Sequence, residues 1–184
     1  MPISALDENA ALILIDLQKG IVGLPTVHPT AEIVGHAAAL ARAFRECGRT
    51  VVLVNVAGRA PGRTEAVRSN LSFPPDWTEL VPELDQQSGD LLVTKHRVGA
   101  FIGTGLDAML RERGVTQIVL AGVSTSSGVE ATARSAFDHG YHVAFAVNAM
   151  TDLSAEAHEY SVGKVFPRIG ETDTTENVLQ LLRG

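Results

Sequence analysis

Short apolar segments alternate with helical patterns along the chain, and this alternation limits the folds that the chain can adopt. The apolar segments are continuous and mostly β-branched, as strands buried on both faces of a parallel sheet should be. Parallel strands must be joined by crossovers, which are usually helices that cover both faces of the sheet. The predicted strands occupy residues 11–15, 51–56, 91–93, 118–121 and 143–147.

The stretches between these predicted strands carry apolar residues at helical spacing. In residues 33–44 they recur at i, i+4, i+7 and i+11, and Gly48 follows as a stop signal. The spacing of a capping box at residues 104–107 predicts a second helix, which ends at Gly114. Two further helices are predicted at about residues 128–139 and 175–182.

The sequence therefore predicts an α/β protein with a doubly wound sheet between two layers of helices. A last edge strand is expected at residues 164–169, where Pro167 lacks an N–H and limits pairing. A length of 184 residues with 45% hydrophobic side chains fits one compact domain over residues 1–184.

Charge and composition exclude several classes of function. The net charge of −6 argues against a nucleic-acid surface, which requires a basic stripe to neutralise phosphates. The longest apolar run, residues 10–15, is too short to span a bilayer, and the N-terminus has no signal-peptide pattern, so no membrane partner is expected. With Cys47 alone no intrachain disulfide can form, which fits a cytoplasmic protein.

Polar residues follow the ends of several predicted strands. In doubly wound folds the binding site lies at the carboxyl ends of the strands, where the strand order reverses. The residues that follow strand ends are Asp16, Asn55, Lys95 and the segment 124–128. We therefore expect the site to be built from these residues.

Asp16 and Lys95 are the candidate charged residues of this site. A carboxylate at the mouth of a parallel sheet is partly desolvated, which favours its protonated form and suits it to general acid or base chemistry near neutral pH. Asp16 could equally cap the next loop. Lys95 could hold Asp16 ionised or bind an anionic substrate, although an isolated lysine is more often a surface residue.

The turn from the predicted strand 118–121 into the following helix reads Gly122-Val-Ser-Thr-Ser-Ser-Gly128. Such a turn points several backbone N–H groups at one spot, and the helix dipole adds positive potential there. This suits an oxyanion or a carboxylate, and the candidate anion-binding residues are Ser124, Thr125, Ser126 and Ser127. The alternative is that the serines and threonine only cap the helix.

The connection over residues 57–90 is long for a crossover. It contains several glycines and prolines together with Arg59, Arg63, Arg68, Phe73 and Trp77. Segments of this length are commonly lids or binding loops with a little helix of their own. The alternative is a solvated crossover whose Trp77 packs on the core.

Taken together, these patterns resemble the isochorismatase-like hydrolases, which belong to the cysteine hydrolase superfamily. The resemblance covers about residues 10–150 and rests on Leu-Ile-Asp16-Leu-Gln, on Lys95-His-Arg-Val-Gly-Ala-Phe101 with Thr104-Gly-Leu-Asp107, and on Gly-Val-Ser-Thr followed by Thr132-Ala-Arg134. It implies a three-layer Rossmann-like fold with a six-stranded, mostly parallel sheet and helices on both faces. It also implies a site made by Asp16, Lys95 and the turn, with a cis peptide between Val123 and Ser124.

The resemblance further implies an unusual site. Most members carry a nucleophilic cysteine at the position of Gly128, and Cys47 lies at the end of a different helix. Nicotinamidase relatives hold a metal with an Asp-x-His pair, where this chain has Asn55-Val-Ala57, so neither metal nor other cofactor is expected. True isochorismatases also have glycine at this position, and their Asp protonates a vinyl ether. They show Tyr and His where this chain has Ser124 and Ser126, so the substrate should differ.

The sequence leaves more than one function open. The first hypothesis is a hydrolase of a small anionic molecule, with Asp16 as acid or base, Lys95 as its partner and no covalent step. A variant uses Ser126 or Ser127 as nucleophile, although no His lies in this turn. The second hypothesis is a catalytically silent binding or scaffolding protein. The resemblance also implies a homodimer or homotetramer. Further candidate substrate contacts are Asn55, Arg59, Trp77 and Phe101.

Overall fold

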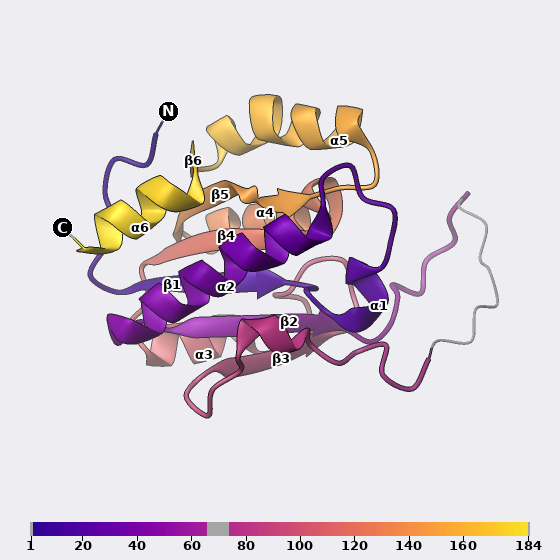
Figure 1. The fold of residues 1–184 in the computed structure, drawn as a ribbon, viewed down its shortest axis with the longest axis horizontal. Coiled ribbons are helices and arrows are strands. Elements are labelled where there is room, and N and C mark those ends of the chain that lie inside the picture. Colours follow the sequence, from indigo (N-terminus) through magenta and orange to yellow (C-terminus); the bar gives the residue numbers. More distant parts are fainter. Residues whose placement is uncertain (1, 66–73, 184) are drawn as a thin grey trace.

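A computed structural model describes residues 2–65 and 74–183 of the chain and shows one parallel sheet between two layers of helices (Figure 1). The six strands are β1 (Ala10–Ile15), β2 (Val51–Val56), β3 (Leu91–Lys95), β4 (Gln117–Val123), β5 (His142–Thr151) and β6 (Glu171–Asp173). Their order is β3-β2-β1-β4-β5-β6, and every paired neighbour is parallel. The predicted doubly wound α/β fold is therefore confirmed.

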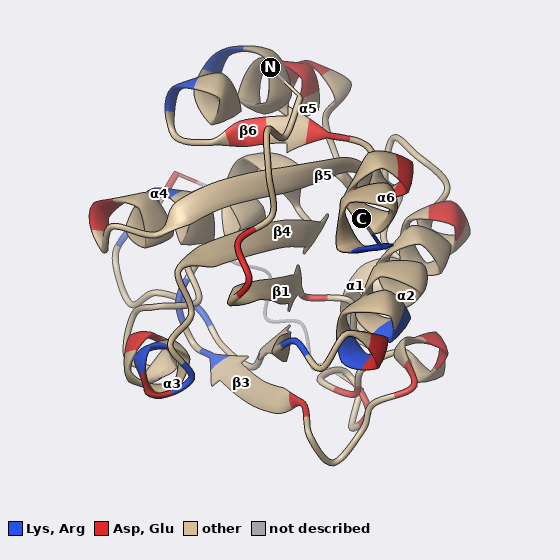
Figure 2. Cartoon of the chain, turned by 90° about the vertical axis from the view of Figure 1, so that its left-hand side faces the viewer, with Lys and Arg blue, Asp and Glu red and all other residues tan. Residues whose placement is uncertain are grey.

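Two layers of helices cover the sheet. The α-helices are α1 (Lys19–Val22), α2 (Thr30–Glu46), α3 (Leu106–Glu112), α4 (Glu130–Asp138), α5 (Ala155–Tyr160) and α6 (Thr175–Arg183). Short 3-10 or π turns occupy η1 (Pro82–Leu84), η2 (Thr125–Val129), η3 (Ser161–Val165) and η4 (Phe166–Arg168). An edge-on view places α2 and α6 on one side of the sheet and α3 and α4 on the other (Figure 2). Charged residues lie mainly on the helices and loops, while the central strands are free of them.

The central strand β1 shows why the sheet is buried on both faces. Leu12 and Leu14 pack against α2 and α6, whereas Ile13 and Ile15 pack against α3 and α4. All six residues of β1 are buried, and burying each large aliphatic side chain contributes roughly 1.5–3 kcal/mol. A continuous apolar run is therefore the pattern that this position in the sheet requires.

Gly122 allows β1 and β4 to approach closely at the end of the sheet that carries the site. Its φ is 121°, and a Cβ built there would lie 2.1 Å from the carbonyl oxygen of Ile15. The pairing of β4 with β5 also shifts register between Leu120 and Gly122. No side chain fits at this position, and the chain turns from here toward η2.

The predicted edge strand at residues 164–169 is wrong. These residues instead belong to η3, η4 and Ile169, and the last strand is β6. The ring of Phe166 stacks on Phe145 with centroids 3.9 Å apart, and this buried contact is made from a helical turn. Pro167 fits such a turn because it has no N–H to donate to a sheet.

The segment from β5 to β6 contains a helix that the apolar pattern did not reveal. Helix α5 is short, and none of its residues is buried, so it has no apolar stripe to detect. Ser154 is its N-cap, with Oγ accepting a hydrogen bond from the N–H of Ala157. Among all the described helices, none has the length and apolar character needed to cross a bilayer.

Candidate active site

Asp16 and Lys95 meet at the carboxyl ends of the strands. Asp16 directly follows β1, Lys95 ends β3, and β2 lies between these two strands. The Nζ of Lys95 lies 2.7 Å from Oδ2 of Asp16, and the two residues are 2% and 5% exposed. Asp16 has a φ of 53°, a conformation that non-glycine residues adopt rarely and that is frequent at functional sites.

The environment of Asp16 suits proton transfer. Burial raises the pKa of Asp16 to about 6, although the charge and the hydrogen bond of Lys95 act in the opposite direction. Its other oxygen, Oδ1, is buried and has no hydrogen-bond partner among the described residues. Buried polar atoms are normally satisfied, so this oxygen is available to a substrate or to water. Asp16 can therefore give or take a proton near neutral pH.

The turn after β4 brings Gly128 beside Asp16. The peptide between Val123 and Ser124 is cis, as expected, and η2 leads from there into α4. A Cβ built at Gly128 would lie 3.3 Å from Oδ2 of Asp16 and 3.0 Å from Cγ2 of Ile15. Position 128 therefore faces the carboxylate of Asp16.

Several backbone donors of the turn are occupied. The N–H groups of Ser127 and Val129 donate to the carbonyl of Ser124, each at 3.1 Å. The N–H of Ser126 donates to Asp152 at 2.7 Å. Among the described residues, the N–H groups of Ser124 and Gly128 make no hydrogen bond outside the helical turn itself. Backbone amides at the start of a helix can hold a carboxylate or an oxyanion.

A cavity of about 240 Å³ lies in front of these groups. Six of the residues predicted for the site line it, namely Asp16, Lys95, Gly128, Ser124, Ser127 and Arg59. The cavity is also lined by Arg97, Val98, Ile21 and Leu24, which the sequence patterns did not indicate. Arg97 lies two residues after Lys95, and this spacing was a usable signal for a further residue of the lining.

Asn55, Trp77 and Phe101 do not line this cavity. The Nδ2 of Asn55 donates to the carbonyl of Thr78, and Asn55 lines a different hollow beside residues 78–82. Trp77 packs over Gly20 and donates from Nε1 to the carbonyl of Val56. Phe101 is 8% exposed and stacks on His139.

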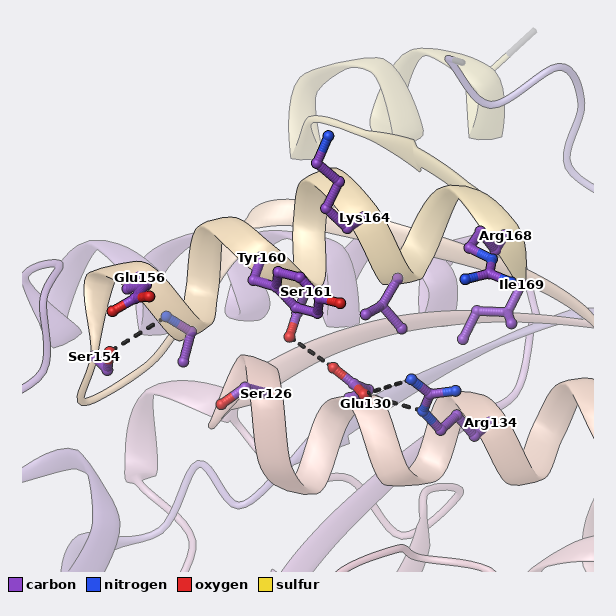
Figure 3. Close-up of a pocket in the computed structure, with 12 residues that line it drawn as sticks. Ser126, Glu130, Arg134, Ser154, Glu156, Tyr160, Ser161, Lys164, Arg168 and Ile169 are labelled. Atoms are coloured by element: carbon purple, nitrogen blue, oxygen red, sulfur yellow. Dashed lines mark hydrogen bonds and ion pairs between the residues drawn. The ribbon is translucent and has the colours of Figure 1, made fainter.

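Thr125 and Ser126 lie in the turn without lining the cavity. Thr125 is fully buried, and its hydroxyl pairs with Nδ1 of His158 at 2.8 Å. Ser126 lines a larger groove of about 1020 Å³ between α4 and the α5–η3 segment (Figure 3). In that groove Glu130 is bonded to Ser161 and Arg134.

The structure describes residues 57–65 and 74–90 of the long connection, and these two parts make different contacts. Arg59 and its neighbours line the cavity, whereas Trp77 covers Gly20, so both alternatives stated for this segment have support. Arg63 is exposed, and it is not among the residues that line the cavity. The expectations for Arg68 and Phe73 fall outside the described residues.

The residues around Asp16 offer no metal-ligand set. Nowhere in residues 2–65 and 74–183 do three His, Cys, Asp or Glu side chains gather as metal ligands would. The carboxylate of Asp16 is paired with the ammonium of Lys95, and Asn55 points toward residue 78. Cys47 is exposed and bonds weakly to the carbonyl of Leu182, away from the cavity.

Comparison with protein families and curated proteins agrees with this architecture. A family model described as the isochorismatase domain matches residues 10–177. An uncharacterized isochorismatase family protein of Bacillus subtilis is 42% identical over 183 residues, covering 96% of this chain and 95% of that protein. A maleamate amidohydrolase of Pseudomonas putida is 28% identical over 184 residues, covering 94% of this chain and 86% of that protein.

Solved structures show the same fold. A structure of an isochorismatase family protein from Burkholderia thailandensis superposes with a TM-score of 0.94 at 38% sequence identity. The match covers 99% of this chain and 100% of that one. Since the family model spans most of the chain and both close relatives cover nearly all of it, the chain belongs to the isochorismatase family of hydrolases.

Proposed function

We propose that this chain hydrolyses a small anionic molecule by acid/base chemistry, without a covalent enzyme intermediate. The observation that carries this proposal is the buried ion pair of Asp16 and Lys95 beside Gly128, a position with no side chain. The ion pair supplies a carboxylate that can transfer protons, whereas position 128 supplies no nucleophilic side chain.

Asp16 supplies the proton transfers in this mechanism. In its protonated form it donates a proton to the substrate, and the resulting carboxylate accepts a proton from the attacking water. Each turnover consumes one water and returns Asp16 to its starting state. The raised pKa of Asp16, about 6, keeps both protonation states accessible near neutral pH. Lys95 stabilises the carboxylate form.

The charge of the cavity favours an anionic substrate. Asp16 and Lys95 neutralise each other, which leaves Arg59 and Arg97 as the other charged residues among the described residues of the lining. The turn residues Ser124, Ser127 and Gly128 also line the cavity, where backbone N–H groups at the start of a helix favour an anion. The relative from Pseudomonas putida is named for maleamate, which is a small amide with a carboxylate. A carboxylate-bearing amide, ester or vinyl ether is therefore the substrate class that we propose.

Gly128 also supports a second candidate, a family member that binds a small molecule without turning it over. A serine-dependent mechanism has less support. The Ser126 hydroxyl donates to Asp152 at 2.8 Å, and Ser126 lies outside the cavity lining. Ser127 lines the cavity, but its hydroxyl forms no hydrogen bond with a described residue that could act as its base.

A panel of carboxylate-bearing vinyl ethers, amides and esters tests the proposal. Each compound should be incubated with the wild type, with Asp16→Asn and with Asp138→Asn, which changes an exposed aspartate at the end of α4. We expect at least one compound to be hydrolysed, with kcat/KM about 10²- to 10⁴-fold lower for Asp16→Asn and unchanged for Asp138→Asn. Binding of a panel compound by wild type and Asp16→Asn alike, with no turnover by either, would support the silent binding protein instead.

A further inference from the structure

Asp152 is a buried carboxylate that lies beside the turn of the candidate active site. It directly follows β5, and the register of the sheet pairs Val123 with Thr151, so Asp152 comes next to the start of the turn. The residue is 5% exposed, yet it does not line the cavity that contains Asp16. Its carboxylate is instead bonded to the turn and to its own segment.

The two oxygens of Asp152 accept four hydrogen bonds. Oδ2 accepts from the N–H of Ser126 at 2.7 Å and from its hydroxyl at 2.8 Å. Oδ1 accepts from the N–H groups of Leu153 at 2.7 Å and Ser154 at 3.3 Å. Hydrogen bonds to an ionised carboxylate are stronger than neutral ones. Oδ2 thus binds the turn through Ser126, and Oδ1 fixes the carboxylate to the backbone that follows Asp152.

The bonds to Ser126 help to hold the turn in place. The N–H of Ser126 is committed to Asp152, and those of Ser127 and Val129 are committed to the carbonyl of Ser124. Three residues of this turn, Ser124, Ser127 and Gly128, line the cavity, and a turn held in this way keeps them there. Preorganised donors act without reorganising when charge develops.

The backbone of Asp152 holds a second wall of the same cavity. Its carbonyl accepts from the N–H of Val27 at 2.9 Å, and the N–H of His28 donates to Thr151 Oγ1 at 3.2 Å. These bonds tie the segment that contains Leu24, a residue of the cavity lining, to the end of β5. The end of β5 therefore connects the turn with the loop between α1 and α2.

We propose that Asp152 is a positioning residue, which orients the 124–128 turn so that position 128 faces Asp16. Any effect of Asp152 on catalysis rests on the proposed function. Its effect on the orientation of the turn can be measured without any substrate. The probe is a thiol placed at position 128, whose reactivity depends on how the turn is oriented.

The test uses a Cys47→Ala, Gly128→Cys background, because Cys47 is exposed and would react as well. The start of a helix and a nearby lysine lower the pKa of a cysteine thiol, whereas the Asp16 carboxylate beside position 128 raises it. All variants share these three groups, so differences in their rates of reaction with iodoacetamide report the orientation of the turn. In this reaction the thiolate displaces iodide from the reagent. The alkylation rate should be measured between pH 6 and 9, with and without Asp152→Asn. Ser154→Ala is the matched control, since it removes the cap of α5 and leaves the bonds to Ser126 intact.

We expect Asp152→Asn to raise the thiol pKa and to slow alkylation at pH 7 about tenfold, which corresponds to one pKa unit. Ser126→Ala removes the hydroxyl bond and keeps the amide bond, so it should give a smaller change in the same direction. Ser154→Ala should leave the rate unchanged. Removing a nearby negative charge without moving the turn would have the opposite sign, because it would lower the thiol pKa and speed alkylation.

Faster or unchanged alkylation in Asp152→Asn would overturn the proposal, and so would an unreactive thiol in the background variant. If Asp152→Asn does not fold, Ser126→Ala carries the test, because Ser126 is only half-buried and its loss leaves the carboxylate in place. Failure of the proposed function would appear separately, as an absence of turnover by the wild type while the thiol still responds to Asp152→Asn.

Discussion

The ammonium of Lys95 lies 2.7 Å from Oδ2 of Asp16, and this ion pair is buried where β1, β2 and β3 end together. Two charges removed from water stabilise the fold only while both are present, because each compensates the desolvation of the other. Oδ1 of Asp16 has no hydrogen-bond partner among the described residues, so these residues do not fully satisfy the pair. In the proposed mechanism, stability and chemistry therefore depend on the same two side chains.

Lys95→Met should destabilise the protein more at pH 8 than at pH 5. Without the ammonium, the pKa of Asp16 rises further, while the unfolded chain keeps its ordinary value near 3.8. The native state then holds a proton that the unfolded state has lost, and this penalty grows as pH rises toward the folded pKa. We expect a loss of about 3–5 kcal/mol at pH 8 and much less at pH 5. Denaturant unfolding at both pH values measures the free energy of unfolding, and the exposed Lys164→Met is the control. Equal losses at pH 5 and pH 8 would contradict a role of Lys95 in compensating the charge of Asp16.

Gly128→Ala should occupy the space beside Asp16 and abolish turnover. The added methyl would lie 3.3 Å from Oδ2 of Asp16 and 3.0 Å from Ile15 Cγ2, so the neighbours must shift slightly. Gly35→Ala, in the exposed part of α2 with nothing within 4 Å, is the control. It should gain up to about 1 kcal/mol of unfolding free energy from helix propensity, and Gly128→Ala should gain less. Full activity in Gly128→Ala would show that position 128 does not face the substrate.

The strands were predictable because buried parallel strands leave a direct mark on composition. All five predicted segments lie within β1 to β5, and the helix predicted around residues 33–44 is α2. The short strand β6 was missed because its sequence, Glu-Thr-Asp, has no apolar pattern. Helix α5 was missed for the same reason, since none of its residues is buried.

The position of the candidate site was predictable from strand ends, whereas its supporting contacts were not. Asp16, Lys95 and position 128 meet as the topology rule requires. Asn55 also follows a strand end, but its amide donates to the carbonyl of Thr78. Asp152 lies about 25 residues after the turn in sequence, and only the pairing of β4 with β5 brings it to Ser126. Strand pairing of this kind leaves no local signal in the sequence.

Acidification should weaken the contact between the turn and α5. Burial lowers the pKa of His158, and the nearby His28 lowers it further, although Asp152 and Glu159 act in the opposite direction. The native state therefore resists protonation of a group that the unfolded chain protonates near 6.5. Stability should be full above pH 6.5 and should fall as pH drops below it. His158→Gln should lose less stability than the wild type between pH 7.5 and 5.5 in denaturant titrations; identical losses would contradict this.

Purified protein should contain no stoichiometric zinc or iron, and dialysis against a chelator should leave its activity unchanged. The reason lies in the donor set, because Asp16 is the only carboxylate among the described residues that line the cavity, and it is paired with Lys95. Elemental analysis of the protein, together with assays before and after chelation, checks this expectation. One equivalent of metal bound near Asn55, lost together with activity on chelation, would contradict it.

The pH dependence of kcat/KM tests the central claim most directly, because this parameter reports the ionisation of the free enzyme. With a substrate identified from the panel, the wild-type profile should inflect near pH 6, the pKa of Asp16. It should fall with rising pH if Asp16 is the general acid and rise if Asp16 is the general base. The residual activity of Asp16→Asn should show no such inflection. A wild-type profile that is flat between pH 5 and 8, or an inflection that persists in Asp16→Asn, would contradict the assignment of Asp16 as the acid/base group.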